Sequence, residues 1–215
     1  MIPHQAYANN GLASLFASKI DENYFEAMDL YKRGQYTRAL RKVNRFLDDY
    51  PGNEDGILLK AWALMKMDEL DEAKPLLDTL LAQNPESPEL QIALGSYYRK
   101  SGEAQKSLEH YQKVLDLNPD DPHALNSILT VALASGEVEK AVFFGKRAYQ
   151  LDPQNPIINA NLAIAYHYAE DFVNRDIHRK NARDLKYHDM KKLSDIFSGR
   201  VSAIPQTESA KISAQ

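Results

Sequence analysis

Histidines and paired acidic residues are the side chains of this sequence that could do chemistry, as metal ligands or as general acids and bases. No two of the six histidines have the i, i+4 spacing that places two metal ligands on one helix face. His167 and His178 could approach each other from two successive helices, but a zinc site needs two or more further ligands. The acidic pairs Asp48–Asp49 and Asp120–Asp121 stand beside prolines, which favours a role in turns and helix N-caps. We therefore expect no metal site and no acid–base pair.

Motifs of the common enzyme classes are missing from the sequence. It contains no H-E-x-x-H, no glycine-rich phosphate loop and no G-x-S-x-G nucleophile turn. It also contains no cysteine, which excludes disulfides, thiolate catalysis and cysteine-ligated zinc and agrees with a reducing compartment. The sequence therefore predicts a protein that is not an enzyme and has no cofactor.

The composition of the 215 residues is that of a water-soluble protein, with 44% hydrophobic and 26% charged residues. A net charge of −4 gives no general affinity for polyanions, so nucleic acid is not an expected partner. No apolar run reaches the ~18 residues that a membrane span needs. Because the N-terminus also lacks the features of a signal peptide, the expected location is the cytoplasm, with export only if the true start lies upstream of Met1.

The elements that would position functional residues are clearest in 88–119, which read PELQIALGSYYRKSGEAQKSLEHYQKVLDLNP. Leu94, Gly95 and Tyr98 have the spacing L-G-x-x-Y, and Gly102 separates two helical stretches. Prolines recur at a constant spacing, at Pro51, Pro85, Pro119 and Pro153. This pattern resembles the tetratricopeptide repeat (TPR), a helix–turn–helix unit with a period of about 34 residues. The resemblance implies an all-α, right-handed solenoid of antiparallel helix pairs, forming one elongated array.

The resemblance extends over about 20–187. It comprises four regular repeats and a degenerate fifth, at about 20–53, 54–87, 88–121, 122–155 and 156–187. Small residues such as Ala73 recur where the two helices of a repeat cross, because they allow close approach of the backbones. At the turn of the second repeat Asp68 replaces glycine, and we expect that turn to form without a positive φ angle. In the fifth repeat Arg175 and Arg179 stand where a small and an aromatic residue belong, which is typical of a terminal helix with a solvated face.

Segments outside the repeats are expected at both ends. Residues 1–19 precede the array, and Leu12, Leu15, Phe16 and Ile20 define one face of a short helix. That helix could cap the first repeat, fill the groove or bind a partner. A capping helix is predicted at 188–199, where Met190, Leu193 and Phe197 share a face, and 200–215 has the composition of a flexible tail. The final residues of the array and the capping helix resemble those of many bacterial TPR proteins, which favours a bacterial source.

The resemblance also implies that the first helix of each repeat lines a concave groove. The groove residues are Tyr24, Met28, Tyr31, Leu58, Trp62, Met65, Ile92, Ser96, Arg99, Asn126, Thr130, Asn161 and Ile164. The N-terminal part is aromatic and rich in methionine, a surface suited to an amphipathic helix or an extended peptide. Asn126 and Asn161 can hold a peptide backbone, or they are solvated polar residues. If the register is off by one position, Trp62 is instead a core residue.

Lysines at the ends of the first helices suggest a basic rim. Lys66 and Lys100 could contact an acidic peptide together with Arg99, or they could only complement the helix dipoles. Some TPR proteins clamp the C-terminal carboxylate of a chaperone with lysines, arginine and asparagines inside three successive first helices. The corresponding positions here hold Tyr24, Met28, Leu59, Glu89 and Ala93. A docking site for such a chaperone tail is therefore not expected.

The sequence thus predicts a non-enzymatic adaptor or scaffold that holds a peptide segment of a partner protein in the concave groove. One alternative is a chaperone that shields an apolar segment of a secreted or assembling client. Another is a structural scaffold that self-associates through the N-terminal segment or the array ends. A client that aggregates without the protein would indicate the first, and a molecular mass that changes on dilution would indicate the second.

Overall fold

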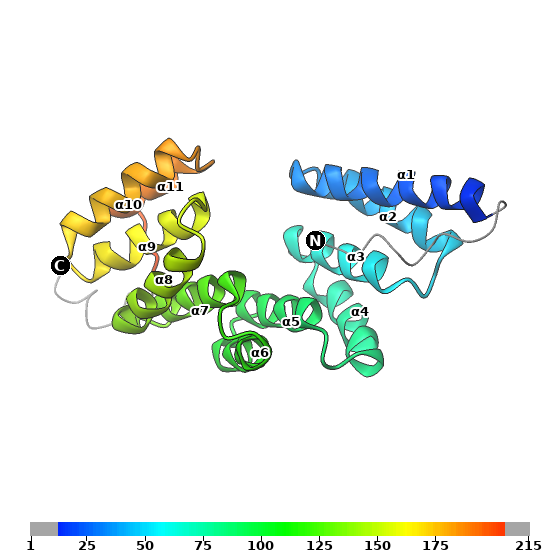
Figure 1. Cartoon of the computed structure of the whole chain (residues 1–215), viewed down its shortest axis with the longest axis horizontal. Coiled ribbons are helices and arrows are strands. Elements are labelled where there is room, and N and C mark those ends of the chain that lie inside the picture. Colours follow the sequence, from blue (N-terminus) through cyan, green and yellow to red (C-terminus); the bar gives the residue numbers. More distant parts are fainter. Residues whose placement is uncertain (1–12, 205–215) are drawn as a thin grey trace. The chain divides into compact units, whose positions relative to one another are not determined.

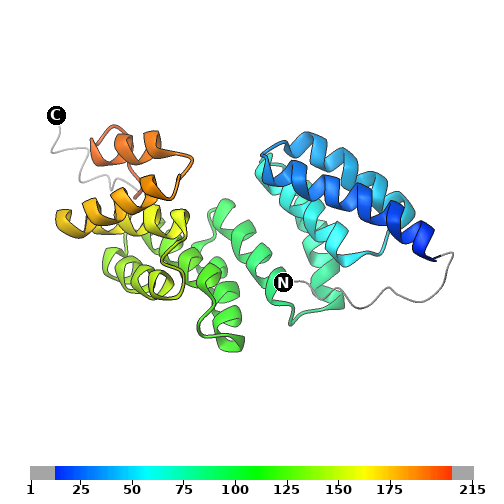
Figure 2. The same ribbon diagram turned by 45° about the horizontal axis from the view of Figure 1, so that its top comes forward.

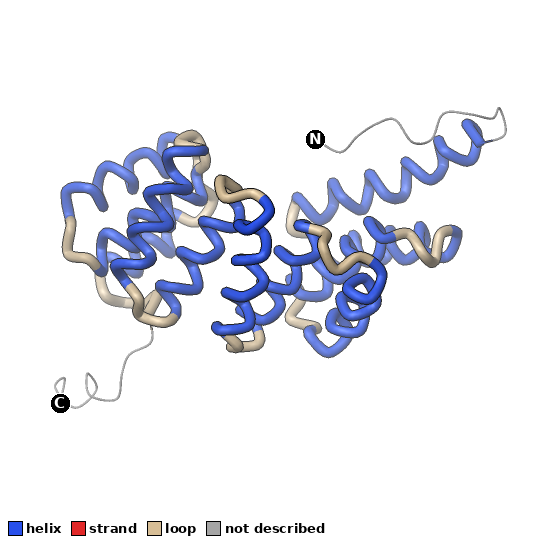
Figure 3. Tube along the Cα trace, turned by 60° about the horizontal axis from the view of Figure 1, so that its bottom comes forward, coloured by secondary structure: helices blue, strands red, loops and turns tan. Residues whose placement is uncertain are grey.

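The computed structural model describes residues 13–204, with side chains described from Glu22 onward. This range contains α-helices joined by short loops and no β-strand (Figures 1 and 3). The helices are α1 (Ala13–Lys32), α2 (Tyr36–Asp49), α3 (Glu54–Lys66), α4 (Leu70–Gln83), α5 (Pro88–Lys100), α6 (Ala104–Leu117), α7 (Pro122–Ala134), α8 (Val138–Leu151), α9 (Pro156–Tyr168), α10 (Phe172–Asp184) and α11 (Met190–Phe197). None of the helices in the described range is both long and apolar enough to cross a membrane.

Each predicted repeat contains one pair of helices, and the turn inside every pair has the same backbone conformation. A positive φ angle recurs with the period of the prolines, at Gly34, Asp68, Gly102, Gly136 and Glu170. The expectation for Asp68 was wrong, because this residue has a φ of 69°. Aspartate tolerates the left-handed region better than most residues, since its short polar side chain can bond locally. The periodic turn is therefore kept without glycine.

The starts of the first helices repeat with the same period. Asn53, Ser87, Asp121 and Asn155 each accept a hydrogen bond from a backbone N–H of the helix that follows. The Asp121 carboxylate, for example, lies 2.7 Å from the Ala124 nitrogen. These side chains satisfy donors that have no partner inside the helix. The expected capping role of the acidic pair at 120–121 is thus confirmed for Asp121.

The segment before the first repeat does not form a separate helix in the described range. Residues 13–19 belong to α1, which continues without a break into the first repeat. Residues 1–12, including Leu12, lie outside the described residues. The short helix expected between Leu12 and Ile20 is therefore the first part of a longer helix.

Packing divides the chain into two compact units, with the boundary between Ala93 and Leu94 inside α5. In the N-terminal unit α1 packs on α2, α2 on α3 and α3 on α4, and neighbouring helices run antiparallel (Figures 1 and 2). In the C-terminal unit α6 to α10 pack in the same sequential manner, and α11 packs on α9. Each helix thus contacts mainly its neighbours in the chain, as repeat proteins do.

Small residues at the helix crossings allow the two helices of a repeat to touch. In the third repeat Gly95 faces the Tyr111 ring so closely that a Cβ atom would lie 2.5 Å from a ring carbon. The Ser107 hydroxyl donates to the Gly95 carbonyl at 2.7 Å, so the crossing is also hydrogen-bonded. Ala73 occupies in the second repeat the position that Ser107 has in the third, and it is fully buried. Ala82 on the same helix is exposed.

Ala73→Leu should therefore destabilise the protein, and Ala82→Leu should not. A larger side chain at Ala73 would force α3 and α4 apart, at a cost of about 1–3 kcal/mol in the free energy of unfolding. Ala82 offers the matched change at a solvent-exposed position of α4. Urea unfolding monitored by circular dichroism gives both values. Equal losses would show that the crossing of α3 and α4 does not depend on the small residue.

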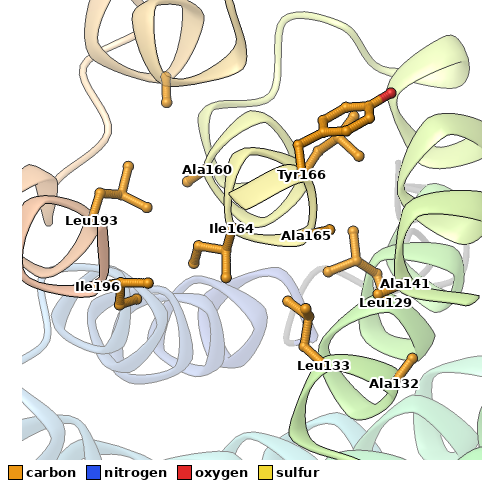
Figure 4. Packing of buried hydrophobic residues seen from close by; sticks show 12 residues of the cluster. Leu129, Ala132, Leu133, Ala141, Ala160, Ile164, Ala165, Tyr166, Leu193 and Ile196 are labelled. Carbon is orange, nitrogen blue, oxygen red and sulfur yellow. The ribbon is translucent and has the colours of Figure 1, made fainter. Parts of the chain in front are cut away.

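The core of the C-terminal unit lies around α9. Leu193 and Ile196 of α11 point toward α9 from one side, while Leu129 and Leu133 of α7 approach it from the other (Figure 4). Ile164 lies between them and is 6% exposed, so its assignment to the groove was wrong. The cause is α11, which covers this part of α9.

The two arginines of the fifth repeat contribute to this end of the core. The Arg175 guanidinium lies over the rings of Phe172 and Phe197, at 4.7 and 5.5 Å from their centroids. Arg179 lies over Phe197 from the same helix and donates to the Ser194 hydroxyl at 3.3 Å. Cation–π contacts thus link α10 to α11, while α10 still packs closely on α9.

The beginning of the predicted tail is packed. The Ala203 N–H donates to the Tyr168 hydroxyl at 2.7 Å, and Ala203 and Ile204 contact the core around α9. The prediction of a flexible tail was therefore wrong for 200–204, because Tyr168 supplies a polar partner and the core supplies apolar contact. Residues 205–215 lie outside the described residues.

Candidate peptide-binding site

The predicted groove residues of α1 lie at the surface of a small core in the N-terminal unit. Tyr24, Met28 and Tyr31 are half-buried and pack around Ala27 and Leu59. Their partial exposure leaves apolar surface accessible along one side of α1. This helix therefore presents aromatic and thioether groups that a peptide could contact.

The two tyrosines remain neutral over the whole physiological pH range. Burial, followed by the nearby Asp55 carboxylate, raises the pKa of Tyr24 to about 12. Burial, followed by the Tyr36 hydroxyl, raises the pKa of Tyr31 to about 12 as well. Both phenols can therefore donate hydrogen bonds to carbonyl groups without carrying charge.

In α3 two of the three predicted residues reach the surface. Leu58 and Trp62 are half-buried, one helical turn apart. Met65 is only 1% exposed, so its assignment to the groove was wrong. Leu133 lies at the same repeat position, two periods later, and is 4% exposed within the C-terminal core. This position therefore faces the packed interior in both repeats.

Ile92 of α5 is the last predicted groove residue of the N-terminal unit and is half-buried. We call this set of first-helix residues the apolar stripe. It consists of Tyr24, Met28, Tyr31, Leu58, Trp62 and Ile92. In the C-terminal unit Ser96 is half-buried and its hydroxyl lies 3.0 Å from that of Tyr111, while Arg99 is exposed. Lys66 and Lys100, the predicted basic rim, are exposed at the ends of α3 and α5.

The two asparagines of the C-terminal unit form a pair. The Asn161 Nδ2 of α9 donates to the Asn126 Oδ1 of α7 at 3.0 Å, and both residues are half-buried. Thr130, one turn beyond Asn126, donates its hydroxyl to the backbone carbonyls of Asn126 and Ser127. Among the residues that the structure describes, the Asn126 Nδ2 and the Asn161 Oδ1 have no hydrogen-bond partner. The amide pair thus keeps one free donor group and one free acceptor.

The repeat period does not predict this pairing, because the two asparagines are not separated by one period of 34 residues. The asparagines are 35 residues apart, as are Tyr24 and Leu59, which belong to one cluster in the N-terminal unit. A residue on the first helix of one repeat therefore contacts the residue 35 positions later, on the first helix of the next repeat, and not the equivalent residue 34 positions later. A search for polar residues with a separation of 35 would have found the pair.

The two histidines of the fifth repeat have different surroundings. His178 of α10 is 6% exposed, lies between the Tyr149 and Tyr166 rings, and has its Nδ1 3.0 Å from the Asn159 Oδ1. The Asn159 Nδ2 donates to two backbone carbonyls, so its Oδ1 faces the imidazole and the His178 Nδ1 is the donor. His167 packs against Phe172 and Phe197. No group of three potential ligands in the described range is placed to hold a metal ion.

Acidification is expected to destabilise the C-terminal unit. Burial lowers the pKa of His178, whereas the unfolded chain titrates near 6.5. The unfolded state therefore binds the proton first, so this contribution to stability is complete above pH 6.5 and is lost as the pH falls through the lower folded-state pKa. His167 acts in the same direction, since burial and then Arg175 lower its pKa. Urea unfolding at pH 7 and pH 5 should show a smaller loss for His178→Gln than for the unmodified chain. An equal loss would exclude His178 as the cause.

Comparison with known proteins identifies the repeats. Models of the tetratricopeptide repeat match residues 30–97 and 92–156, and together they span more than half of the chain. A thermophilic TPR protein of Thermus thermophilus, TTC0263, has a similar structure with a TM-score of 0.73 and 20% identity, over 84% of this chain and 97% of that one. MamA 41-end from Desulfovibrio magneticus RS-1 has a TM-score of 0.58 and 17% identity, over 78% of this chain and 95% of that one. No curated protein sequence matches. The chain belongs to the tetratricopeptide repeat family and has its all-α solenoid fold, a scaffold for protein interactions.

Proposed function

We propose that this protein is a non-enzymatic adaptor that holds an extended peptide segment of a partner protein on its first helices. The observation that carries the proposal is the amide pair of Asn126 and Asn161. Its free Nδ2 group and free Oδ1 atom can bond the C=O and N–H groups of a peptide backbone, which every peptide presents. The amide pair therefore supplies affinity that tolerates differences in sequence.

The apolar stripe would add a preference for certain side chains in the segment that contacts the N-terminal unit. Aromatic and thioether groups at half-buried positions gain contact area when an apolar side chain covers them. Methionine adapts to irregular shapes, and the neutral tyrosines add hydrogen-bond donors. A peptide with apolar residues at alternate or helical spacing matches this surface. Arg99, which is exposed at the end of α5, would favour an acidic residue in a peptide that contacts this helix.

Asn126→Asp tests the role of the amide pair. Aspartate has almost the same shape and still accepts from Asn161, but it has no donor and adds a negative charge. Binding of a peptide selected on the full-length protein from a random library should weaken at least tenfold, by about 1.4 kcal/mol or more. Fluorescence anisotropy of the labelled peptide gives the dissociation constant. Asn181→Ala is the control, since Asn181 is a half-buried asparagine of the second helix α10. This change should leave the dissociation constant of the peptide unchanged.

The same experiment separates the alternatives. Affinity that survives both Asn126→Asp and the loss of Trp62 would place the peptide elsewhere and contradict the proposal. A chaperone would select many unrelated apolar peptides with similar affinity and would keep a client from aggregating. A self-assembling scaffold would change its molecular mass in light scattering over a dilution series, without any added peptide.

A further inference from the structure

One repeat position that is apolar and buried in the C-terminal unit is charged in the N-terminal unit. Leu94, Ile128 and Leu162 occupy it in the third, fourth and fifth repeats, and each is at most 2% exposed. The same position holds Glu26 in the first repeat and Lys60 in the second, and both are only half-buried. A charged side chain at a core position has to be neutralised or kept in contact with water.

Only one of the two charged residues has an ion-pair partner among the described residues. The Glu26 carboxylate pairs with the Lys42 ammonium of α2 at 2.6 Å. Lys60 forms no ion pair or hydrogen bond through its side chain with any of the residues described from Glu22 to Ile204. Within the described part of the N-terminal unit, Lys60 is therefore a half-buried ammonium group without an ion-pair partner.

Lys60 lines a cavity of about 530 Å³ between α2, α3 and α4. Leu47, Ile57 and Leu76 form apolar walls, together with Pro51. The polar lining consists of the half-buried Lys60 and Asn44 and the exposed Asp48 and Thr79. A volume of this size accommodates a small ligand. The cavity involves both second helices, α2 and α4, whereas the apolar stripe lies on the first helices alone.

We propose that this cavity binds an apolar carboxylate, with the carboxylate paired to Lys60 and the apolar body against Leu47, Ile57 and Leu76. An anion would neutralise the unpaired ammonium, and an apolar group on the same molecule would cover the aliphatic walls. A fatty acid and the C-terminal residue of a peptide share this chemistry. Asn44, Asp48 and Thr79 favour the peptide end, because they can accept hydrogen bonds from its N–H groups and a fatty acid has none.

Titration of the full-length protein with three small probes, followed by amide chemical shifts, tests the proposal. The probes are N-acetyl-leucine, N-acetyl-leucinamide and hexanoate. N-acetyl-leucine should shift the amides around the cavity, and the amide probe, which lacks the carboxylate, should bind at least tenfold more weakly. Tighter binding of N-acetyl-leucine than of hexanoate would support a peptide C-terminus. The reverse order would support a free fatty acid within the same proposal.

Variants show whether Lys60 is responsible. Lys60→Met keeps the aliphatic stem and removes the charge, and it should weaken N-acetyl-leucine at least tenfold without lowering the melting temperature. Lys66→Met, at an exposed lysine of the same helix, is the matched control and should bind normally. Trp62→Ala should also bind the probe normally, which separates this site from the proposed peptide surface. Unchanged binding by Lys60→Met, equal binding of acid and amide, or no shift with any probe at about 20 mM would overturn the proposal.

Discussion

Gly145→Val should destabilise the C-terminal unit by about 3 kcal/mol. A Cβ atom on Gly145 of α8 would lie 2.5 Å from a terminal methyl group of Leu129 and 2.7 Å from one of Leu162. Both leucines are fully buried, so their methyl groups have no free space into which to move. The extra volume of valine therefore has to separate α8 from α7 and α9, which form the core of this unit.

Urea unfolding followed by circular dichroism measures the loss. Gln150→Val introduces the same residue at an exposed position of α8 and should cost less than about 1 kcal/mol. Gly145→Ala should cause a loss in the free energy of unfolding between those of Gly145→Val and Gln150→Val. The gain in helix propensity, about 1 kcal/mol, offsets part of the cost of the steric overlap of the new Cβ atom. If Gly145→Val were as mild as Gln150→Val, the close packing of the three helices would be refuted.

Trp62→Ala should weaken binding of the selected peptide at least tenfold. Trp62 is the only tryptophan of the chain and is a half-buried member of the apolar stripe on α3. Large aromatic residues at such positions contribute about 2 kcal/mol or more to many interfaces. Because Trp62 is partly exposed, its truncation leaves little cavity, and the free energy of unfolding should fall by only about 1 kcal/mol.

Phe143→Ala is the matched control, since Phe143 is an exposed aromatic residue on the second helix α8. It should leave the peptide affinity unchanged. The intrinsic fluorescence of Trp62 gives an independent signal, because a bound peptide should shift its emission to the blue. A loss of about 3 kcal/mol or more in stability, with unchanged peptide affinity, would make Trp62 a core residue.

The repeat period of the sequence predicted most of the fold. The evenly spaced prolines predicted the repeats, and the family comparison confirms them. The turns follow the same period even at Asp68, where the residue type suggested otherwise. The residue types at turns and helix starts, together with a fixed period, were sufficient to predict the repeats, since each repeat contacts chiefly its neighbours.

The surface was harder to predict, because exposure depends on what the neighbouring helices cover. Met65 and Ile164 matched groove positions by counting, but packing buries both. Residues 200–204 have the composition of a tail, yet Tyr168 bonds the Ala203 backbone from 35 positions earlier. The partner of a side chain that lies in another helix cannot be obtained from the period alone.

The amide shift map of the peptide complex tests the central claim most directly. The protein is titrated with the selected peptide, and the shift of every assigned backbone amide is measured. For a selected peptide with an amidated C-terminus, we expect the largest shifts on the first helices α1, α3, α5, α7 and α9, around Trp62 and the amide pair, with small shifts on the second helices. Large shifts confined to α2, α4, α8 and α10, with none on the first helices, would contradict it.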